Sequence, residues 1–332
     1  MNTTVIIVGD RGQDGTLLRA SLEKQGIEVV GVGRNRVSMP LSHGGGITGD
    51  FSIDNTEQVL NLVAHVRPTE IYYLAAHHVS SEQHGADNSP DEYDAYHGTH
   101  VVGLLNFLWA IRKHSPQSRL FYAASSLVFN GNHGPTQNEE TPFTPVGFYG
   151  LTKTQGLFIC REFRERHGVF ASGGILYNHE SALRLQNFLS KKIISSAHQI
   201  SLGLQQNLLV GNLSAETDWG YAPDYVEAFQ LILKTNTAAD FVIATGESHS
   251  VEEFVKIAFN CFGLDSEKFV LENPNVLNRT VPRKIGDYTK LKISTGWMPT
   301  LTFPEMVKTL VNDYLISIKS NNISNLTKCQ LQ

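Results

Sequence analysis

Tyr149 and Lys153 have the side-chain types and the spacing for proton transfer. Residues four positions apart lie on one face of a helix, so the phenol and the ammonium can face the same ligand. A nearby cation favours the phenolate and lowers a tyrosine pKa from its reference of about 10, so that the oxygen exchanges a proton near neutral pH. Ser125 or Ser126 can hydrogen-bond the same substrate oxygen. By itself, Tyr-x-x-x-Lys is also typical of a solvated helix face, so the interpretation depends on the surrounding elements.

The chain around these residues alternates between strand and helix patterns. Short β-branched and aromatic runs predict strands at residues 5–8, 28–32, 71–76 and 119–124. Apolar residues at helical spacing predict helices after the first strand and at residues 55–65, 98–113 and 149–167. This alternation indicates an α/β fold with a doubly wound parallel sheet that helices cover on both faces. Such sheets bind ligands at the carboxyl ends of their strands.

A glycine-spaced turn joins the first predicted strand to the first predicted helix. Gly9, Gly12 and Gly15 have the G-x-x-G-x-x-G spacing, in which missing side chains permit a tight turn. The same absence lets phosphate oxygens approach the amides at a helix N-terminus. Because the turn lies inside a βαβ unit, it predicts a dinucleotide site.

The residues after the second predicted strand favour NADP over NAD. Arg34-Asn35-Arg36 stand where an NAD-binding protein usually places an acid for the ribose hydroxyl, and a guanidinium suits a 2′-phosphate. A solvated basic loop is the alternative interpretation. Asp50, after the next short strand, is either a contact to the adenine or an ordinary turn aspartate.

The composition is that of an ordinary globular protein. The 332 residues are 41% hydrophobic and 18% charged, with a net charge of -5 and no basic excess that would indicate a nucleic-acid partner. Because there is no apolar run long enough for a bilayer and no signal-peptide layout, we expect a cytoplasmic protein without membrane contact. The three cysteines are widely separated and odd in number, which argues against disulfides or a zinc site. We expect no bound metal.

A histidine-rich stretch at residues 77–84 follows the third predicted strand, whose end faces the predicted cofactor. Histidine titrates near neutrality and carries protons, so this stretch can supply an acid or a base. Metal binding is an alternative, but the spacings match no known ligand frame, and a polar loop is the simpler interpretation. His97 and His100 flank the start of a predicted helix, and we expect neither to be catalytic.

Together with later motifs, these residues resemble the extended short-chain dehydrogenase/reductases that modify nucleotide sugars. The shared features are the glycine spacing, Leu74-Ala75-Ala76, the serine pair and Tyr149-x-x-x-Lys153. The chain is most similar to the GDP-mannose 4,6-dehydratases, with Gln13-Asp14 between the last two glycines. Further similar motifs lie at residues 176–181, 211–213, 218–225, 241–246 and 295–299. The resemblance spans nearly the whole chain.

The resemblance implies a Rossmann domain for NADP at residues 1–175 and a smaller C-terminal α/β lobe, interleaved with it, at residues 176–319. That lobe would bind a GDP-linked sugar, and residues 320–332 would form a flexible tail. Motifs and resemblance together predict catalytic roles for Ser125, Tyr149 and Lys153. Predicted cofactor contacts are Gly9, Gly12, Gln13, Asp14, Gly15, Arg34, Asp50, Leu74, Ala75, Ala76, Tyr149 and Lys153. Predicted substrate contacts are His78, Ser126, Asn178, Glu180, Lys192, Asn212 and Arg283; for Lys192 a plain surface lysine is the alternative.

Three positions depart from the dehydratase pattern. With Ser125 as the catalytic hydroxyl, Leu127 stands where the dehydratases carry the glutamate that removes the C5 proton and helps to expel the C6 hydroxyl. An isobutyl group transfers no proton, and general acid–base catalysis is typically worth about 10² to 10⁴-fold. Thr217 replaces an arginine before Asp-Trp-Gly, which would weaken phosphate binding or alter nucleotide choice. Ala95 stands where many relatives have an asparagine that supports the active-site helix.

These departures favour NADP(H)-dependent reduction at C4 of a GDP-linked 4-keto-6-deoxy sugar, which does not need the missing carboxylate. The alternative is a GDP-mannose 4,6-dehydratase whose acid/base comes from another residue. A hypothesis of another class is a catalytically silent NADP-binding sensor or partner subunit. The resemblance also implies a homodimer or homotetramer that packs the Tyr149 helix against its twin, with Phe158, Ile159 and Phe163 as candidate contacts or as internal core.

Overall fold

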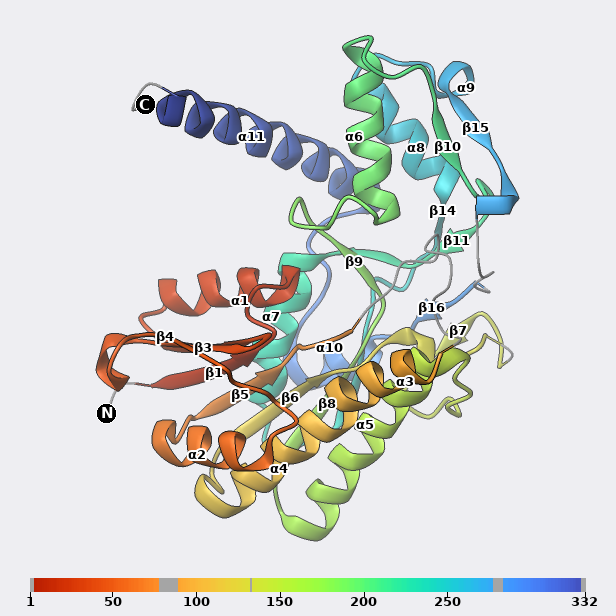
Figure 1. Cartoon of the computed structure of the whole chain (residues 1–332). Coiled ribbons are helices and arrows are strands. Elements are labelled where there is room, and N and C mark those ends of the chain that lie inside the picture. Colours follow the sequence, from red (N-terminus) through yellow and green to blue (C-terminus); the bar gives the residue numbers. More distant parts are fainter. Residues whose placement is uncertain (1–2, 78–88, 132, 277–282, 330–332) are drawn as a thin grey trace.

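A computed structural model describes residues 3–77, 89–131, 133–276 and 283–329. The predicted substrate contact His78 lies outside these ranges. Within them, eight strands form one large sheet (Figure 1). In spatial order the strands are β13 (Asp240–Ile243), β8 (Phe170–Leu176), β6 (Arg119–Ala123), β5 (Glu70–Tyr73), β1 (Thr4–Val8), β2 (Glu28–Gly33), β3 (Arg36–Met39) and β4 (Gly46–Gly49). The strands from β13 to β2 are parallel, and β3 and β4 extend the edge as antiparallel strands.

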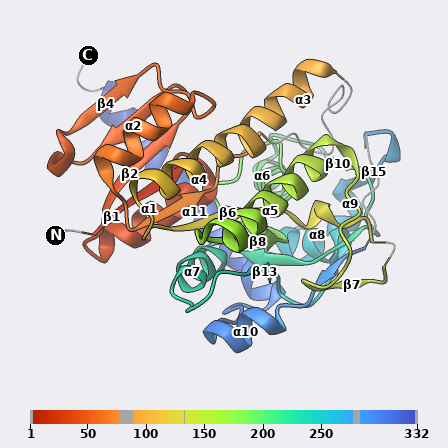
Figure 2. The same ribbon diagram turned by 90° about the horizontal axis from the view of Figure 1, so that it is seen from below.

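Helices cover both faces of the sheet, which confirms the predicted doubly wound α/β fold (Figures 1 and 2). One face carries α1 (Gln13–Lys24), α7 (Ala222–Leu233) and α10 (Thr289–Thr295), and the other carries α2 (Thr56–Val66), α4 (Gly103–His114) and α5 (Gly147–His167). Helix α3 (Pro90–His97) runs into a π-helical turn, η2 (Gly98–Val102), which leads into α4.

Strand β1 explains why the sheet has two cores. Ile6 and Val8 belong to the apolar cluster under α2, α4 and α5, whereas Val5 and Ile7 belong to the cluster under α1 and α7. Successive side chains of a strand point to opposite faces, so a strand covered on both sides has to be apolar throughout. The run Val5-Ile6-Ile7-Val8 meets that requirement.

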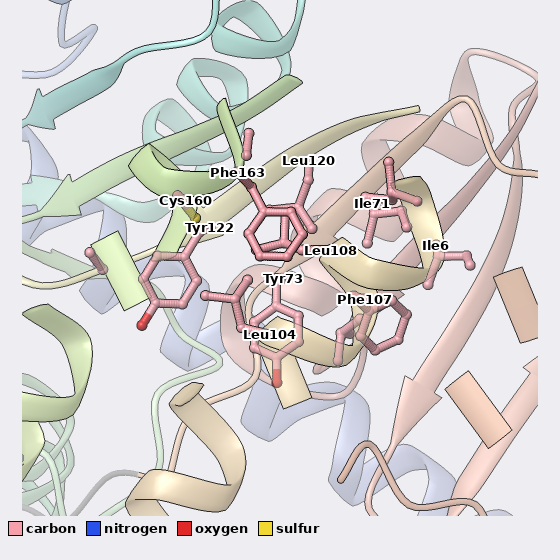
Figure 3. Packing of buried hydrophobic residues seen from close by; sticks show 14 of the residues in the cluster. Ile6, Ile71, Tyr73, Leu104, Phe107, Leu108, Leu120, Tyr122, Cys160 and Phe163 are labelled. Carbon is pink, nitrogen blue, oxygen red and sulfur yellow. The ribbon is translucent and has the colours of Figure 1, made fainter. Parts of the chain in front are cut away.

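The core beneath α4 and α5 also supports the site (Figure 3). Tyr73 of β5 and Tyr122 of β6 project from neighbouring strands among Leu104 and Phe107 of α4 and Cys160 and Phe163 of α5. Tyr122 needs a glycine opposite its ring, because a Cβ at Gly156 would lie 2.2 Å from the phenol oxygen. Helix α5 therefore sits close against the sheet just beyond Lys153.

A third apolar cluster forms the core of a smaller lobe, drawn at the upper right of Figure 1. Its helices are α6 (Leu189–Ser201), α8 (Val251–Asn260), α9 (Ser266–Phe269) and α11 (Phe303–Cys329). Short strand pairs join the lobe internally and to the sheet domain: β10 (Leu208–Val210) with β15 (Val270–Glu272), β11 (Glu216–Thr217) with β14 (His249–Ser250), β9 (Asn178–Glu180) with β12 (Trp219–Tyr221), and β7 (Thr136–Gln137) with β16 (Ile285–Gly286). The remaining 3₁₀ turns are η1 (Leu41–His43), η3 (Ser126–Val128) and η4 (Pro274–Val276).

The chain crosses between the two parts more than once. Strand β13 and helices α7 and α10 come from the half of the sequence predicted to form the substrate lobe, yet they complete the large sheet domain. The predicted strand at residues 71–76 ends at Tyr73, because residues 74–77 leave the sheet beside the Gly9 turn.

Residues 320–329 were predicted as a polar tail, but they continue α11 as far as Cys329 (Figure 1). Helix α11 contains no glycine or proline after Pro304 that would end it. Its backbone hydrogen bonding can therefore continue through the polar sequence. Polarity alone is a poor signal for the end of a helix.

Candidate active site

The glycine turn after β1 has the shape that a dinucleotide phosphate requires. Gly9 has a φ of 93°, and a Cβ there would lie 2.8 Å from the Ala75 amide nitrogen. A Cβ at Gly15 would lie 2.3 Å from the Gly9 carbonyl oxygen. Helix α1 starts at Gln13, and the Gly12 N-cap offers no side chain to its first amides. These backbone amides can therefore donate hydrogen bonds to an anionic ligand.

Gln13 and Asp14, two predicted cofactor contacts, connect the turn to β9 and the segment after it. Gln13 donates from Nε2 to the His179 carbonyl at 3.1 Å and accepts from the Ser181 hydroxyl at 2.8 Å. Asp14 Oδ2 lies 3.0 Å from His179 Nε2. Burial raises the pKa of Asp14, but His179 and Arg184 together with the hydrogen bonds outweigh burial and hold that pKa below its ordinary value. Strand β9 is thereby anchored at the first turn of α1.

Two arginines follow β2, one exposed and one partly buried. Arg34 is exposed in the turn, whereas Arg36 reaches back to the glycine turn and donates to Asp10 at 2.7 Å. The antiparallel register places Arg36 opposite Gly33, and a Cβ at Gly33 would lie 3.0 Å from Arg36 Nε. The hairpin between β2 and β3 brings Arg36 to the glycine turn, while the predicted cofactor contact Arg34 stays exposed in the hairpin turn. Asp50 is exposed, with a φ of 56°.

Ser125 and Ser126 lie where β6 leaves the sheet. The Ser125 hydroxyl oxygen accepts from the Leu127 amide at 3.2 Å and caps η3. Ser126 is buried, and its carbonyl accepts from the Lys284 ammonium at 2.8 Å. Lys284 also donates to the Phe129 carbonyl at 3.3 Å. Lys284, just before β16, therefore bonds to the backbone on both sides of Leu127 and fixes the serine loop.

Tyr149 and Lys153 meet this loop from α5. The buried Lys153 ammonium donates to the Ala123 carbonyl at 2.8 Å and lies 5.8 Å from the centroid of the Tyr149 ring. Burial lowers the pKa of Lys153 to about 7. Gly150 packs on the loop, since a Cβ there would lie 2.4 Å from the Leu127 carbonyl oxygen. The structure thus brings the end of β6 and the predicted catalytic helix together, with Leu127 at their junction.

His100, which sequence reasoning set aside, packs directly against Tyr149. The two ring centroids are 5.2 Å apart and the rings are nearly perpendicular, while Tyr96 contacts both. His100 is fully buried in the π-helical turn η2. Ala95 lies one turn earlier, on α3. No periodic pattern signals such a contact, because a π-turn shifts the helix face by one residue.

The predicted substrate residues of the lobe lie in different surroundings. Asn178 is exposed on β9, next to the strand that follows Asp218. Glu180 is buried and accepts from Ser190 at 2.6 Å and from Arg184 at 3.0 Å. Lys192 is half-buried on α6, and Asn212 accepts from the Ser214 amide and hydroxyl, each at 2.8 Å.

Arg283 pairs with a residue of the short strand pair that contains Thr217. It donates from Nε to Glu216 at 2.8 Å and to the Ser248 hydroxyl at 3.0 Å. Glu216 and Thr217 form β11, opposite β14. The guanidinium predicted to bind phosphate is therefore paired with a carboxylate of the same lobe.

The part of the chain that the structure describes shows no group of three or more His, Cys, Asp or Glu side chains placed to hold a metal ion. In the same ranges, no helix combines the length and apolarity that a membrane span requires.

Comparison with known proteins decides the family. The family model described as GDP-mannose 4,6 dehydratase matches residues 6–310. This chain belongs to the GDP-mannose 4,6-dehydratase family. GDP-mannose 4,6 dehydratase 2 of Arabidopsis thaliana is 34% identical over 343 residues, which cover 96% of this chain and 88% of the relative. Membership of the family makes the chain an enzyme of the short-chain dehydrogenase/reductase type.

Solved structures of related enzymes share the fold at lower identity. The Thermus thermophilus UDP-glucose 4-epimerase in complex with NAD has a TM-score of 0.75 at 19% identity, covering 94% of this chain and 99% of the epimerase. RMD from Pseudomonas aeruginosa in complex with NADPH has a TM-score of 0.77 at 17% identity, with coverage of 94% and 99%. These two complexes, one with NAD and one with NADPH, share the fold of this chain.

Proposed function

We propose that this enzyme uses NADP(H) to reduce C4 of a nucleotide sugar, and that its substrate is a GDP-linked 4-keto-6-deoxyhexose. The observation that carries the proposal is Leu127, which lies in η3 against Gly150 of α5, at the position where the resemblance to the dehydratases implies a glutamate. The serine, tyrosine and lysine that reduction needs are all retained around it.

The glycine turn fits the dinucleotide. Gly9 and Gly15 leave space that a Cβ would fill, and the first amides of α1 have no side-chain cap. When bound, NADP(H) supplies a hydride to the substrate carbon. Arg34 is exposed in the turn between β2 and β3, where a guanidinium favours a 2′-phosphate over a ribose hydroxyl, and Arg36, which opens β3, pairs with Asp10.

The residues around the serine loop have distinct roles in the reduction. Ser125 donates a hydrogen bond to the C4 carbonyl oxygen and orients it. As the carbon accepts the hydride, the Tyr149 phenol gives its proton to that oxygen, and solvent restores the proton afterwards. Lys153, fixed on the Ala123 carbonyl, lies beside the phenol, and its protonated form favours the phenolate.

Elimination of water from the sugar needs a further acid and base besides Ser125, Tyr149 and Lys153. A C5 proton must be removed and the C6 hydroxyl must be protonated as it leaves, and Leu127 does neither. The second candidate function is nevertheless GDP-mannose 4,6-dehydration, which the family match over residues 6–310 favours. In that case another group would have to act as the acid and base.

Product mass separates the two functions. We expect the purified enzyme to oxidise NADPH when given a GDP-4-keto-6-deoxyhexose, with a product heavier by two hydrogens. Conversion of GDP-mannose to a product lighter by one water, without net consumption of NADPH, would instead establish the dehydratase.

Tyr149→Phe tests whether the chain is an enzyme or a silent NADP-binding subunit. The substitution removes the proton donor and leaves the ring, so turnover should fall by about 10² to 10⁴-fold while NADPH binding persists. A wild-type protein that binds NADPH yet turns over none of several GDP-keto sugars or GDP-mannose would favour the silent subunit.

A further inference from the structure

His100 occupies a polar position in an otherwise apolar interior. It lies in η2, the π-helical turn between α3 and α4, and is fully buried. The neighbouring Thr99 carbonyl accepts from the Tyr73 phenol at 2.6 Å, so β5 holds this turn from beneath. A buried imidazole is costly unless its nitrogens are hydrogen-bonded, and turns of this type often occur at functional sites.

The hydrogen bonds of His100 define its protonation state. Nε2 accepts the His77 amide at 3.2 Å, so this nitrogen carries no proton. Nδ1 lies 2.8 Å from the Thr152 hydroxyl oxygen. That hydroxyl donates its own proton within α5, 2.8 Å from the Phe148 carbonyl, so Nδ1 must be the donor toward Thr152. These two hydrogen bonds fit a neutral imidazole with its proton on Nδ1.

This arrangement excludes one role and supports another. To act as the acid or base in place of the missing glutamate, His100 would have to give up the His77 amide or the Thr152 hydroxyl. Its ring instead presses against the Tyr149 ring at a centroid distance of 5.2 Å, edge to face. Thr152 is one residue from Lys153 and three from Tyr149, so the imidazole holds the same helical turn by a hydrogen bond and by a ring contact.

The Nε2 atom of His100 bonds to the segment beside the glycine turn, where the cofactor is predicted to bind. His77 directly follows Leu74, Ala75 and Ala76, and the Gly9 turn packs on the Ala75 backbone. His100 therefore bridges the segment next to the glycine turn and the helix that carries the phenol.

We infer that His100 is a positioning residue for Tyr149: a neutral imidazole that fixes the phenol relative to the segment following β5. The inference rests on the proposed role of Tyr149 as proton donor. Because a displacement of about 1 Å in a reacting group can cost about 10²-fold in rate, the loss should appear in kcat rather than in binding.

Substitutions at both ends of the His100–Thr152 hydrogen bond test this role. We expect His100→Leu to lower kcat by about 10 to 100-fold while KM and the NADPH dissociation constant stay within about threefold. Thr152→Val should reproduce part of the loss in kcat, whereas Thr152→Ser, which keeps the hydroxyl, should have nearly the wild-type kcat. In a double-mutant cycle the losses from His100→Leu and Thr152→Val should be less than additive.

His97→Leu is the matched control, because His97 stacks on Tyr93 rather than on Tyr149. It should leave kcat within about twofold of the wild type. A wild-type kcat in His100→Leu, or equal losses in His97→Leu and His100→Leu, would overturn the inference.

Nuclear magnetic resonance gives a readout that does not depend on turnover. The ¹⁵N shifts of His100, assigned by their absence in His100→Leu, should report a proton on Nδ1 and none on Nε2. The Tyr149 ring signals should move in Thr152→Val and return in Thr152→Ser. A proton on Nε2, or unmoved Tyr149 signals, would refute the positioning role. If the wild type reduced no GDP-keto sugar, the proposed function would fail, and these spectra would still decide whether His100 holds the ring.

Discussion

Burial makes the charge of Lys153 depend on the fold. Its pKa is lowered from 10.5 to about 7, because the interior stabilises the ammonium less than water does. Between these values the unfolded chain binds the proton and the folded chain does not. The free energy of unfolding should therefore rise with pH across this range.

Lys153→Met isolates that contribution, because methionine has a similar length and no charge. In cofactor-free protein, urea unfolding between about pH 7 and 10.5 should show the wild-type free energy of unfolding rising relative to that of Lys153→Met. Parallel curves for the two proteins would show that the Lys153 pKa is not lowered.

Leu127 is the residue that decides between reduction and dehydration. Leu127→Glu places a carboxylate beside η3 and α5, so we expect it to raise water elimination from GDP-mannose by about 10² to 10⁴-fold over the wild type. Leu127→Gln is the control, with the same size and no acid. Mass spectrometry of the products measures the effect, and equal rates in the two variants would contradict it.

At the scale of elements, the turn between β1 and α1 needs glycine because a side chain there would clash with neighbouring backbone atoms. Gly15→Ala forces a Cβ to within 2.3 Å of the Gly9 carbonyl, and such overpacking typically costs about 1–3 kcal/mol. We expect a lower melting temperature and at least tenfold weaker NADPH binding, because helix α1 must move away from the phosphate position.

Gly49→Ala is the matched control for this element. A Cβ at Gly49 has open space around it, and Gly49 is absent from the positive-φ residues. Calorimetry and NADPH titration should therefore show little change. A Gly15→Ala protein that binds NADPH like the wild type would show that the turn does not approach the dinucleotide.

Helix α5 shows how far periodicity predicts an element. Phe158, Ile159 and Phe163 were candidates for a subunit contact or for internal core. Phe163 lies in the core and Ile159 packs against it, whereas Phe158 is 53% exposed. A helical repeat identifies residues on the same side, but only the packed neighbours decide which of them face solvent.

At the scale of the whole molecule, the outer face of α5 is the candidate subunit contact. We expect a dimer in solution, with Leu151 and Phe158 covered by the partner, since both are exposed apolar residues two turns apart. Phe158→Glu should place a charge in that contact and shift the protein toward monomer in sedimentation velocity. Ile293→Glu, on the exposed side of α10, should not. A monomeric wild type would contradict the expected assembly.

The two parts of the molecule are joined at the predicted site itself. Asp14 of the glycine turn pairs with His179 of β9, and Lys284 reaches from the start of β16 to the loop of Ser126. Both links connect segments more than 150 residues apart. These links tie the glycine turn and the serine loop to segments from the second half of the chain.

The sequence by itself predicted the first strands and helices of the large sheet, the glycine turn and the candidate set of Ser125, Tyr149 and Lys153. These features depend on local spacing: side-chain alternation, helical repeats and the steric needs of a turn. Only the tertiary structure decided that His100 packs on Tyr149 and that Arg36 pairs with Asp10 beside the glycine turn. Both contacts depend on how separate elements meet, since a strand register and a π-turn place side chains that local spacing leaves free.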